Sequence, residues 1–170
     1  HIYFNMFGRF FRGGEFVFHG RSKRPPIDEI NVVLSLLYTM QTHSISSALE
    51  TAGIDPYIGF FHTLRPGRQS LALDMVEEFR AVIDRFAVTV FNLKQLNKAD
   101  FDYGVSGTVL LNDEGRKKLI KLWQDKKKET VFHYTLGEKI PFGLLPFVQA
   151  SLMGKFLRKE IKEYPPYIIK

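Results

Sequence analysis

Residues 70–90 read SLALDMVEEFRAVIDRFAVTV and carry the most regular apolar pattern of the 170-residue chain. Apolar side chains recur at i, i+4, i+7, i+11, i+14 and i+18, which are Ala72, Val76, Phe79, Ile83, Phe86 and Val90. An α-helix turns once every ~3.6 residues, so this spacing places these side chains on one face. The pattern therefore predicts one long helix whose apolar face enters the core.

Helices are also expected on both sides of this segment, because capping and stopping residues frame further apolar runs. The expected ranges are 2–11, 29–52, 113–128, and a last helix from Pro141 that restarts near Pro146 and ends before Pro165. Asp28 and Asn112 are residue types that cap helix N-termini. Alternation typical of strands is rare, with residues 15–18 and 108–111 as the expected short extended pieces. The sequence therefore predicts an all-α, multi-helical fold, with residues 1–170 forming a single helical domain.

Composition narrows the class of protein before any site is considered. Hydrophobic residues make up 45% and charged residues 25%, which is typical of a globular chain. Lys and Arg number 24 against 18 Asp and Glu, so the net charge of +6 suits an anionic partner. The sequence has no cysteine, which excludes disulfides, thiolate metal sites and a cysteine nucleophile and fits a reducing compartment. We therefore expect a cytoplasmic location.

Residues 30–49 contain no Asp, Glu, Lys or Arg and are long enough to cross a membrane. Their many polar side chains would make insertion costly. These are Asn31, Ser35, Thr39, Gln41, Thr42, His43, Ser44, Ser46 and Ser47. A buried amphipathic helix is the better interpretation, and no membrane partner is expected.

Three carboxylates and a histidine are the best candidates for chemistry. Asp74, Glu77 and Glu78 are spaced i, i+3 and i+4, so on a helix their side chains lie next to one another and repel. His62 precedes them by one short loop, whose Pro66-Gly67 pair turns the chain back toward the helix. An imidazole that meets these carboxylates could hold Mg²⁺ or Mn²⁺ for phosphodiester chemistry. An acidic first helical turn in solvent and a structural histidine are the alternative interpretation.

Basic residues indicate where an anionic polymer could bind. Arg65 and Arg68 lie on the loop that follows His62, where they could contact a phosphate backbone. The helix expected over 113–128 is also strongly basic, and either a solvated face or nucleic-acid contact explains it. The remaining histidines share no short spacing with other candidate ligands, and we interpret them as structural or surface residues: His1, His19, His43 and His133.

Several ordered segments resemble the signature of the CRISPR adaptation integrase family, the endonuclease-like subunit that inserts new spacers into a CRISPR array. The main ones are GIDPYIGFFH at 53–62, RPGR at 65–68 and SLALDMVEEFR at 70–80. Further matches are RPP at 24–26 with Asp28 and Asn31, LLNDEGR at 110–116, LGEK at 136–139 and YPPY at 164–167. The resemblance covers essentially the whole chain.

The resemblance implies an all-helical C-terminal catalytic domain, which in this family follows a small β-rich domain used for dimerisation. It also implies a divalent metal, Mg²⁺ or Mn²⁺, held by a glutamate, a histidine and an acidic residue. His62 and Glu77 match two of these ligands, and Asp74 matches the acidic position beside the metal. The family's first glutamate belongs to a Gly-x-Glu-Gly segment that we expect upstream of His1.

Function and partners follow from the same resemblance. It implies transesterification in which a 3′-hydroxyl of incoming DNA attacks a phosphodiester of the CRISPR repeat, performed by a homodimer with a small companion subunit. The residues expected to contact the DNA backbone are Arg65, Arg68, Arg21, Lys23 and Arg24. Two alternatives stay open: a non-catalytic helical scaffold that binds DNA or a partner, and an unrelated basic helical DNA-binding domain.

Overall fold

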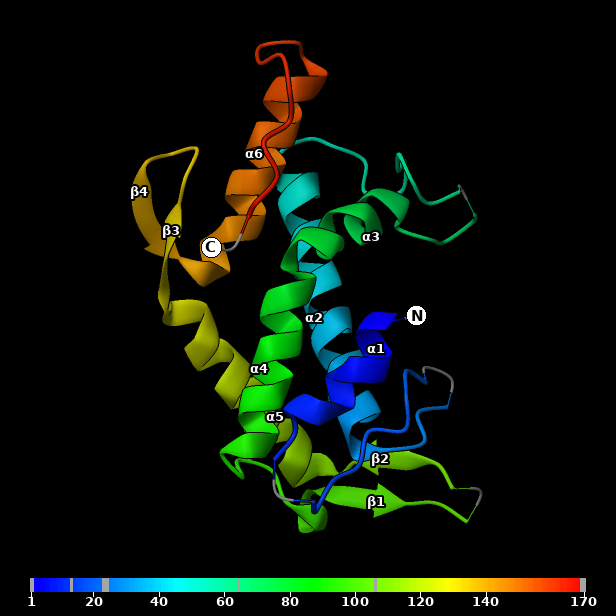
Figure 1. Ribbon diagram of the computed structural model, residues 1–170. Coiled ribbons are helices and arrows are strands. Elements are labelled where there is room, and N and C mark those ends of the chain that lie inside the picture. The colour runs from blue at the N-terminus through cyan, green and yellow to red at the C-terminus, as the bar shows by residue number, and fades with distance from the viewer. Residues whose placement is uncertain (1, 13, 23–24, 64, 106, 169–170) are drawn as a thin grey trace. The chain divides into compact units, whose positions relative to one another are not determined.

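The computed structural model describes residues 2–12, 14–22, 25–63, 65–105 and 107–168. Helices dominate this part of the chain, and its strands form two short two-stranded sheets (Figure 1), so the prediction of a mainly helical fold is confirmed. The chain divides into two compact units, His1–Leu37 with Val82–Trp123 and Tyr38–Ala81 with Gln124–Lys170. It passes between the first unit and the second unit within α2 (Glu29–Thr51), α4 (Arg80–Asn92) and α5 (Asp113–Lys128).

Helix caps in the first unit are the ones expected from the sequence. The unit begins with α1 (Ile2–Phe7) and the 3-10 turn η1 (Gly8–Phe10). Asp28 caps α2, because its Oδ1 accepts a hydrogen bond from the Asn31 backbone N–H at 2.7 Å. Asn112 caps α5 in the same way and accepts from the Gly115 N–H at 2.9 Å.

The first unit contains a small antiparallel sheet, of which only one of the two strands was predicted. It joins β1 (Phe101–Tyr103), which follows the 3-10 turn η3 (Lys98–Asp100), to β2 (Val109–Leu111), with Phe101 opposite Leu111. The extended piece predicted over 108–111 is therefore confirmed as β2. A strand of three residues is too short for alternation to reveal, which explains why β1 was not predicted. The extended piece predicted over 15–18 is wrong, since no strand is assigned there.

Aromatic and aliphatic side chains form the core of the first unit. Phe7 packs edge-on against Phe11 and Phe18, each with ring centroids 5.2 Å apart. Phe86 lies against the fully buried Trp123 at 5.1 Å. The three stripe residues that belong to this unit are buried, as predicted: Ile83, Phe86 and Val90.

The helix expected to be continuous over 70–90 is interrupted. It consists of α3 (Ser70–Val76), the 3-10 turn η2 (Glu77–Phe79) and α4. The apolar face itself is confirmed, since Ala72, Val76 and Phe79 are also buried. Glu78 in the turn accepts hydrogen bonds from residues far away in the sequence. Such tertiary contacts do not affect the spacing of apolar residues along the chain, so the interruption of the helix could not be predicted.

The rest of the second unit is a hairpin followed by the last helix. The hairpin pairs β3 (Thr130–His133) with β4 (Glu138–Pro141) and was not predicted. The 3-10 turn η4 (Phe142–Leu144) then leads into α6 (Leu145–Leu157), which places the expected restart one residue before Pro146. Within the described ranges, no helix combines the length and apolarity that a membrane crossing requires.

Candidate functional site

The loop between α2 and α3, in the second unit, carries His62 and turns the chain back as expected. The Arg68 N–H donates to the Arg65 carbonyl at 3.0 Å, and Gly67 between them has φ +72°. Pro66 and Gly67 thus occupy the central positions of a β-turn for which their backbone preferences suit them. A hydrogen bond of 2.9 Å from the Leu71 N–H to the Pro56 carbonyl ties the loop to the start of α3.

Asp74 holds the loop through four hydrogen bonds to three consecutive residues. Its Oδ2 accepts from the backbone N–H groups of Phe60 at 2.7 Å and Phe61 at 2.9 Å. Its Oδ1 accepts from the backbone N–H of His62 at 3.1 Å and lies 2.5 Å from His62 Nδ1. The side chain of Asp74 is only 5% exposed. The predicted meeting of the His62 imidazole with a carboxylate of the helix is therefore confirmed for Asp74.

Gly59 is required because the loop passes very close to α3. A Cβ atom on this residue would lie 2.7 Å from Asp74 Oδ2 and 2.7 Å from the Ser70 carbonyl carbon. Only glycine permits this approach of backbone to helix. The Gly-Phe-Phe-His segment is thus shaped to fit around the Asp74 carboxylate.

The environment of Asp74 favours its ionised form. Burial by itself raises the pKa of Asp74, but the hydrogen bonds from the Phe61 N–H, the His62 imidazole and the Phe60 N–H outweigh it, and the pKa lies below its ordinary value of 3.8. A carboxylate can only accept, so the hydrogen of the neutral His62 ring lies on Nδ1 and the lone pair on Nε2. The His62 side chain is 31% exposed, and the lone pair on Nε2 is the one that could bind a ligand.

Replacing Asp74 with asparagine is expected to lower the free energy of unfolding by about 1–3 kcal/mol, because the NH2 group that replaces one carboxylate oxygen cannot accept hydrogen bonds from the loop. A pKa that folding lowers stabilises the folded state above pH 3.8, and this contribution disappears as the pH falls through the folded-state pKa. Urea unfolding at about pH 7 and about pH 3 tests both points. The difference in the free energy of unfolding between wild type and Asp74→Asn should be smaller at the lower pH. An equal difference at both pH values would contradict the stabilising role of the ionised Asp74 carboxylate.

Glu77 in η2 is the second predicted metal ligand, and Arg80 holds its carboxylate. Arg80 Nε donates to Oε2 at 2.7 Å and Nη2 donates to Oε1 at 2.6 Å, so the pair is bidentate. Arg80 Cζ also lies 5.3 Å from the centre of the Tyr38 ring. The Glu77 side chain is 51% exposed, so it is open to solvent on this face of the turn.

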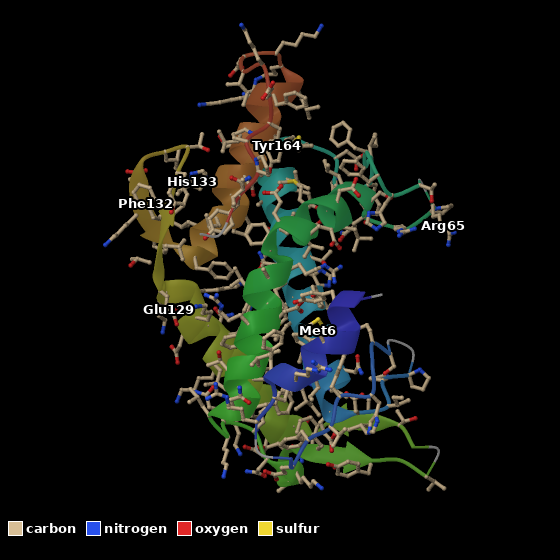
Figure 2. All side chains as sticks on the ribbon, in the orientation of Figure 1. Met6, Arg65, Glu129, Phe132, His133 and Tyr164 are labelled. Atoms are coloured by element: carbon tan, nitrogen blue, oxygen red, sulfur yellow. The ribbon has the colours of Figure 1, made fainter. Side chains whose placement is uncertain are left out.

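Glu78 belongs to a different network from Asp74, so the expected cluster of three neighbouring carboxylates is wrong. Its oxygens accept from Gln149 Nε2 at 2.8 Å, the Tyr164 hydroxyl at 2.7 Å and the Tyr167 N–H at 2.8 Å. Burial raises the pKa of Glu78 despite these hydrogen bonds. The network continues from Gln149 Oε1 to His133 Nε2 at 2.9 Å. Figure 2 labels His133 and Tyr164, which come from β3 and the segment after α6.

This network was missed because its members are far apart in the sequence and follow no motif. His133 is 2% exposed, which confirms its structural interpretation. Glu78 anchors the segment after α6 to the turn that carries Glu77. It is therefore a structural carboxylate beside a candidate ligand.

The predicted DNA-contacting residues lie in different parts of the chain. Arg65 is exposed on the loop that leads to α3, and Figure 2 shows it pointing away from that helix. Arg68 is half-buried on the same loop. Arg21 is in the first unit, where Nη1 donates to Asn31 Oδ1 at 2.8 Å and to the Ser22 carbonyl at 2.7 Å. Lys23 and Arg24 lie outside the described residues.

The imidazole and carboxylate groups at this site are of the kinds that bind divalent metals. The contact of Asp74 with His62 Nδ1 is the carboxylate–histidine arrangement that orients a metal-binding imidazole. The Glu77 carboxylate is an oxygen ligand of the kind that Mg²⁺ and Mn²⁺ prefer. Among the residues that the structure describes, no group of three or more His, Asp or Glu side chains could hold a metal ion. By their chemistry His62 and Glu77 could each contribute a ligand to a divalent metal, but the described residues do not assemble a complete site.

Known proteins are similar to this chain in sequence and in fold. The family model described as CRISPR associated protein Cas1 matches residues 1–125. A CRISPR-associated endonuclease Cas1 of Rhodospirillum rubrum is 46% identical over 172 residues, which cover 99% of the chain and 50% of the relative. The chain thus spans about half the length of the curated relatives it matches.

Two solved structures have a similar fold. A casposase bound to integration product matches with a TM-score of 0.89 and 20% identity, over 98% of this chain and 47% of that chain. A chain of a partial Cas6-RT-Cas1–Cas2 complex matches with a TM-score of 0.79 and 25% identity, over 99% of this chain and 50% of that chain. At 20% identity the casposase match shows the fold alone.

Proposed function

The chain belongs to the Cas1 family, and on that premise we propose that it is the catalytic half of a metal-dependent DNA integrase that inserts new spacers into a CRISPR array. The observation that carries the proposal is the His62 imidazole, which Asp74 orients on a loop that also bears Arg65. The relatives of the chain are named as CRISPR-associated endonucleases, which supports a function in phosphodiester chemistry. Family membership excludes the alternative of an unrelated DNA-binding domain.

We place the divalent metal, Mg²⁺ or Mn²⁺, on His62 and Glu77. When bound, the metal acts as a Lewis acid toward the phosphodiester that reacts. Asp74 keeps the hydrogen of the His62 ring on Nδ1 and thereby leaves Nε2 free to bind. Arg80 restricts the Glu77 carboxylate to one position through its bidentate contact. Each of the two proposed ligands, His62 and Glu77, thus has a neighbouring side chain that orients it.

The proposed reaction exchanges one phosphodiester for another. The 3′-oxygen of the incoming DNA forms a bond to phosphorus, and the bond between phosphorus and the 3′-oxygen of the repeat strand breaks. The attacking hydroxyl releases a proton, and the leaving oxygen takes one up. With water in place of the incoming DNA, the same steps constitute endonuclease activity.

Arg65 and Arg68 are the second-unit residues that we place on the DNA backbone. Cations at this position raise affinity in a salt-dependent manner and carry no sequence information. A small companion subunit is supported by the match to a chain of a Cas1–Cas2 complex. The homodimer and the cytoplasmic location stay predictions.

The test is a Mn²⁺-dependent integration assay on a supercoiled plasmid that contains CRISPR repeats. The chain is compared with a version extended at its N-terminus by the corresponding half of the Rhodospirillum rubrum relative. We expect strand transfer from the extended version only, and its loss when EDTA removes the metal. The intact relative serves as the positive control.

A non-catalytic scaffold is the second candidate function. It is favoured by the absence, among the described residues, of a group of three metal-binding side chains. It predicts that the extended version binds DNA without transferring strands while the intact relative remains active. That result would exclude the catalytic proposal for this chain.

A further inference from the structure

The loop that bears His62 exposes an unusual amount of apolar surface. Tyr57, Ile58, Phe60 and Phe61 are all exposed large side chains within five consecutive positions. Phe61 directly precedes His62 and is 91% exposed. Single exposed apolar side chains are common, whereas a contiguous group next to a candidate site indicates a binding surface.

The backbone beneath Phe61 is held firmly. Its N–H donates to Asp74 Oδ2, as does that of Phe60, and Gly59 lies against α3. The Phe61 ring is therefore presented to solvent from a backbone that is held in place. A rigid loop that exposes an aromatic ring loses little conformational entropy when a ligand covers that ring.

The charge around Phe61 selects the class of ligand. Residues 56–69 contain no Asp or Glu and carry two cations, Arg65 and Arg68, and the nearby Asp74 carboxylate is only 5% exposed. Arg65 is exposed on the same loop. Aromatic rings beside cations are the combination that binds nucleic acid, in which bases stack on the rings and phosphates meet the cations.

We propose that Phe61 stacks on an unpaired base of the DNA substrate, next to the phosphodiester that reacts at His62. This inference rests on the proposed function. Neighbouring Cα atoms lie ~3.8 Å apart, so a nucleotide whose phosphate reaches His62 has its own base, or the adjacent one, within reach of Phe61. The loop thus contacts DNA that is opened or single-stranded at the reacting position.

The test measures binding of two labelled oligonucleotides by fluorescence anisotropy. One is a fully paired duplex, and the other has the same duplex with a single-stranded 3′ overhang that contains 2-aminopurine. We expect Phe61→Ala to weaken binding of the overhang DNA by about 5- to 150-fold, the range for loss of one base stack. Quenching of 2-aminopurine should be lost, and binding of the paired duplex should be unchanged.

Control variants separate stacking from folding and from charge. Phe61→Trp keeps an aromatic ring and should retain both affinity and quenching. Leu157→Ala removes an apolar side chain that is 47% exposed at the end of α6, outside this loop, and it should bind like wild type. Arg65→Ala should weaken both DNAs alike and reduce the dependence of affinity on salt. Circular dichroism confirms that each variant is folded.

Three outcomes overturn the inference in distinguishable ways. If wild type and Phe61→Ala bind the overhang DNA equally, stacking is wrong while the proposed function stands. If Phe61→Ala changes self-association in sedimentation velocity but not DNA binding, Phe61 packs against protein. If wild type binds neither DNA, the proposed function fails for this chain and the inference fails with it.

Discussion

Replacing His62 with alanine is expected to reduce strand transfer by the extended chain about 10³-fold or more. The substitution removes a proposed metal ligand, and a metal supplies several kcal/mol of transition-state stabilisation, each ~1.4 kcal/mol of which corresponds to a factor of ten in rate. The imidazole is one of several partners of Asp74, whose backbone contacts to the loop remain. The variant should therefore keep its fold, which circular dichroism can check.

His43→Ala is the matched control for this experiment. His43 is exposed on α2 and belongs to the second unit, as His62 does. Its removal should leave the rate of strand transfer unchanged. A folded His62→Ala variant with the rate of wild type would show that His62 is a structural histidine and would remove the basis of the proposed metal site.

Replacing Gly59 with alanine is expected to disable the site almost as completely without touching a ligand. The new Cβ would lie 2.7 Å from both Asp74 Oδ2 and the Ser70 carbonyl carbon, so backbone atoms must move apart. The loop could then not close on Asp74, and His62 would lose the contact that orients it. Overpacking of this kind costs about 1–3 kcal/mol of folding free energy. Urea unfolding and strand transfer should both report the change.

Gly104→Ala is the control for the glycine substitution. A Cβ on Gly104 would have its nearest contact at 3.5 Å, an ordinary van der Waals distance. This variant should unfold and react like wild type. If Gly59→Ala did the same, the close packing of the loop against α3 would not matter for orientation of His62.

Local signals predicted most of the helical framework. Asp28 and Asn112 cap helices where expected, since a cap depends on one side chain and the next few N–H groups. The apolar face of residues 70–90 enters the core because its period matches a helical turn. The β1–β2 pair and the β3–β4 hairpin were missed in part or whole, since short strands depend on their partners and not on their own pattern.

The sequence predicted those parts of the candidate site that depend on contacts between nearby residues. The meeting of His62 with a carboxylate of the helix follows from the Pro66-Gly67 turn between them, whereas the structure shows that this carboxylate is Asp74. The role of Glu78 was not predictable. Its spacing from Asp74 suggests one cluster, yet its partners Gln149 and Tyr164 come from the C-terminal part of the chain.

From the order of residues alone one obtains the helical class, the caps, the core-facing stripe and the return of His62 to the carboxylates of the helix. Each of these depends on contacts within a few residues or one turn of chain. The break at Glu77–Phe79, the burial of Glu78 and the bidentate hold of Arg80 on Glu77 emerge only when the chain is folded. They depend on which surfaces pack together, and a side chain's partner across the fold is set by that packing and not by its spacing along the chain.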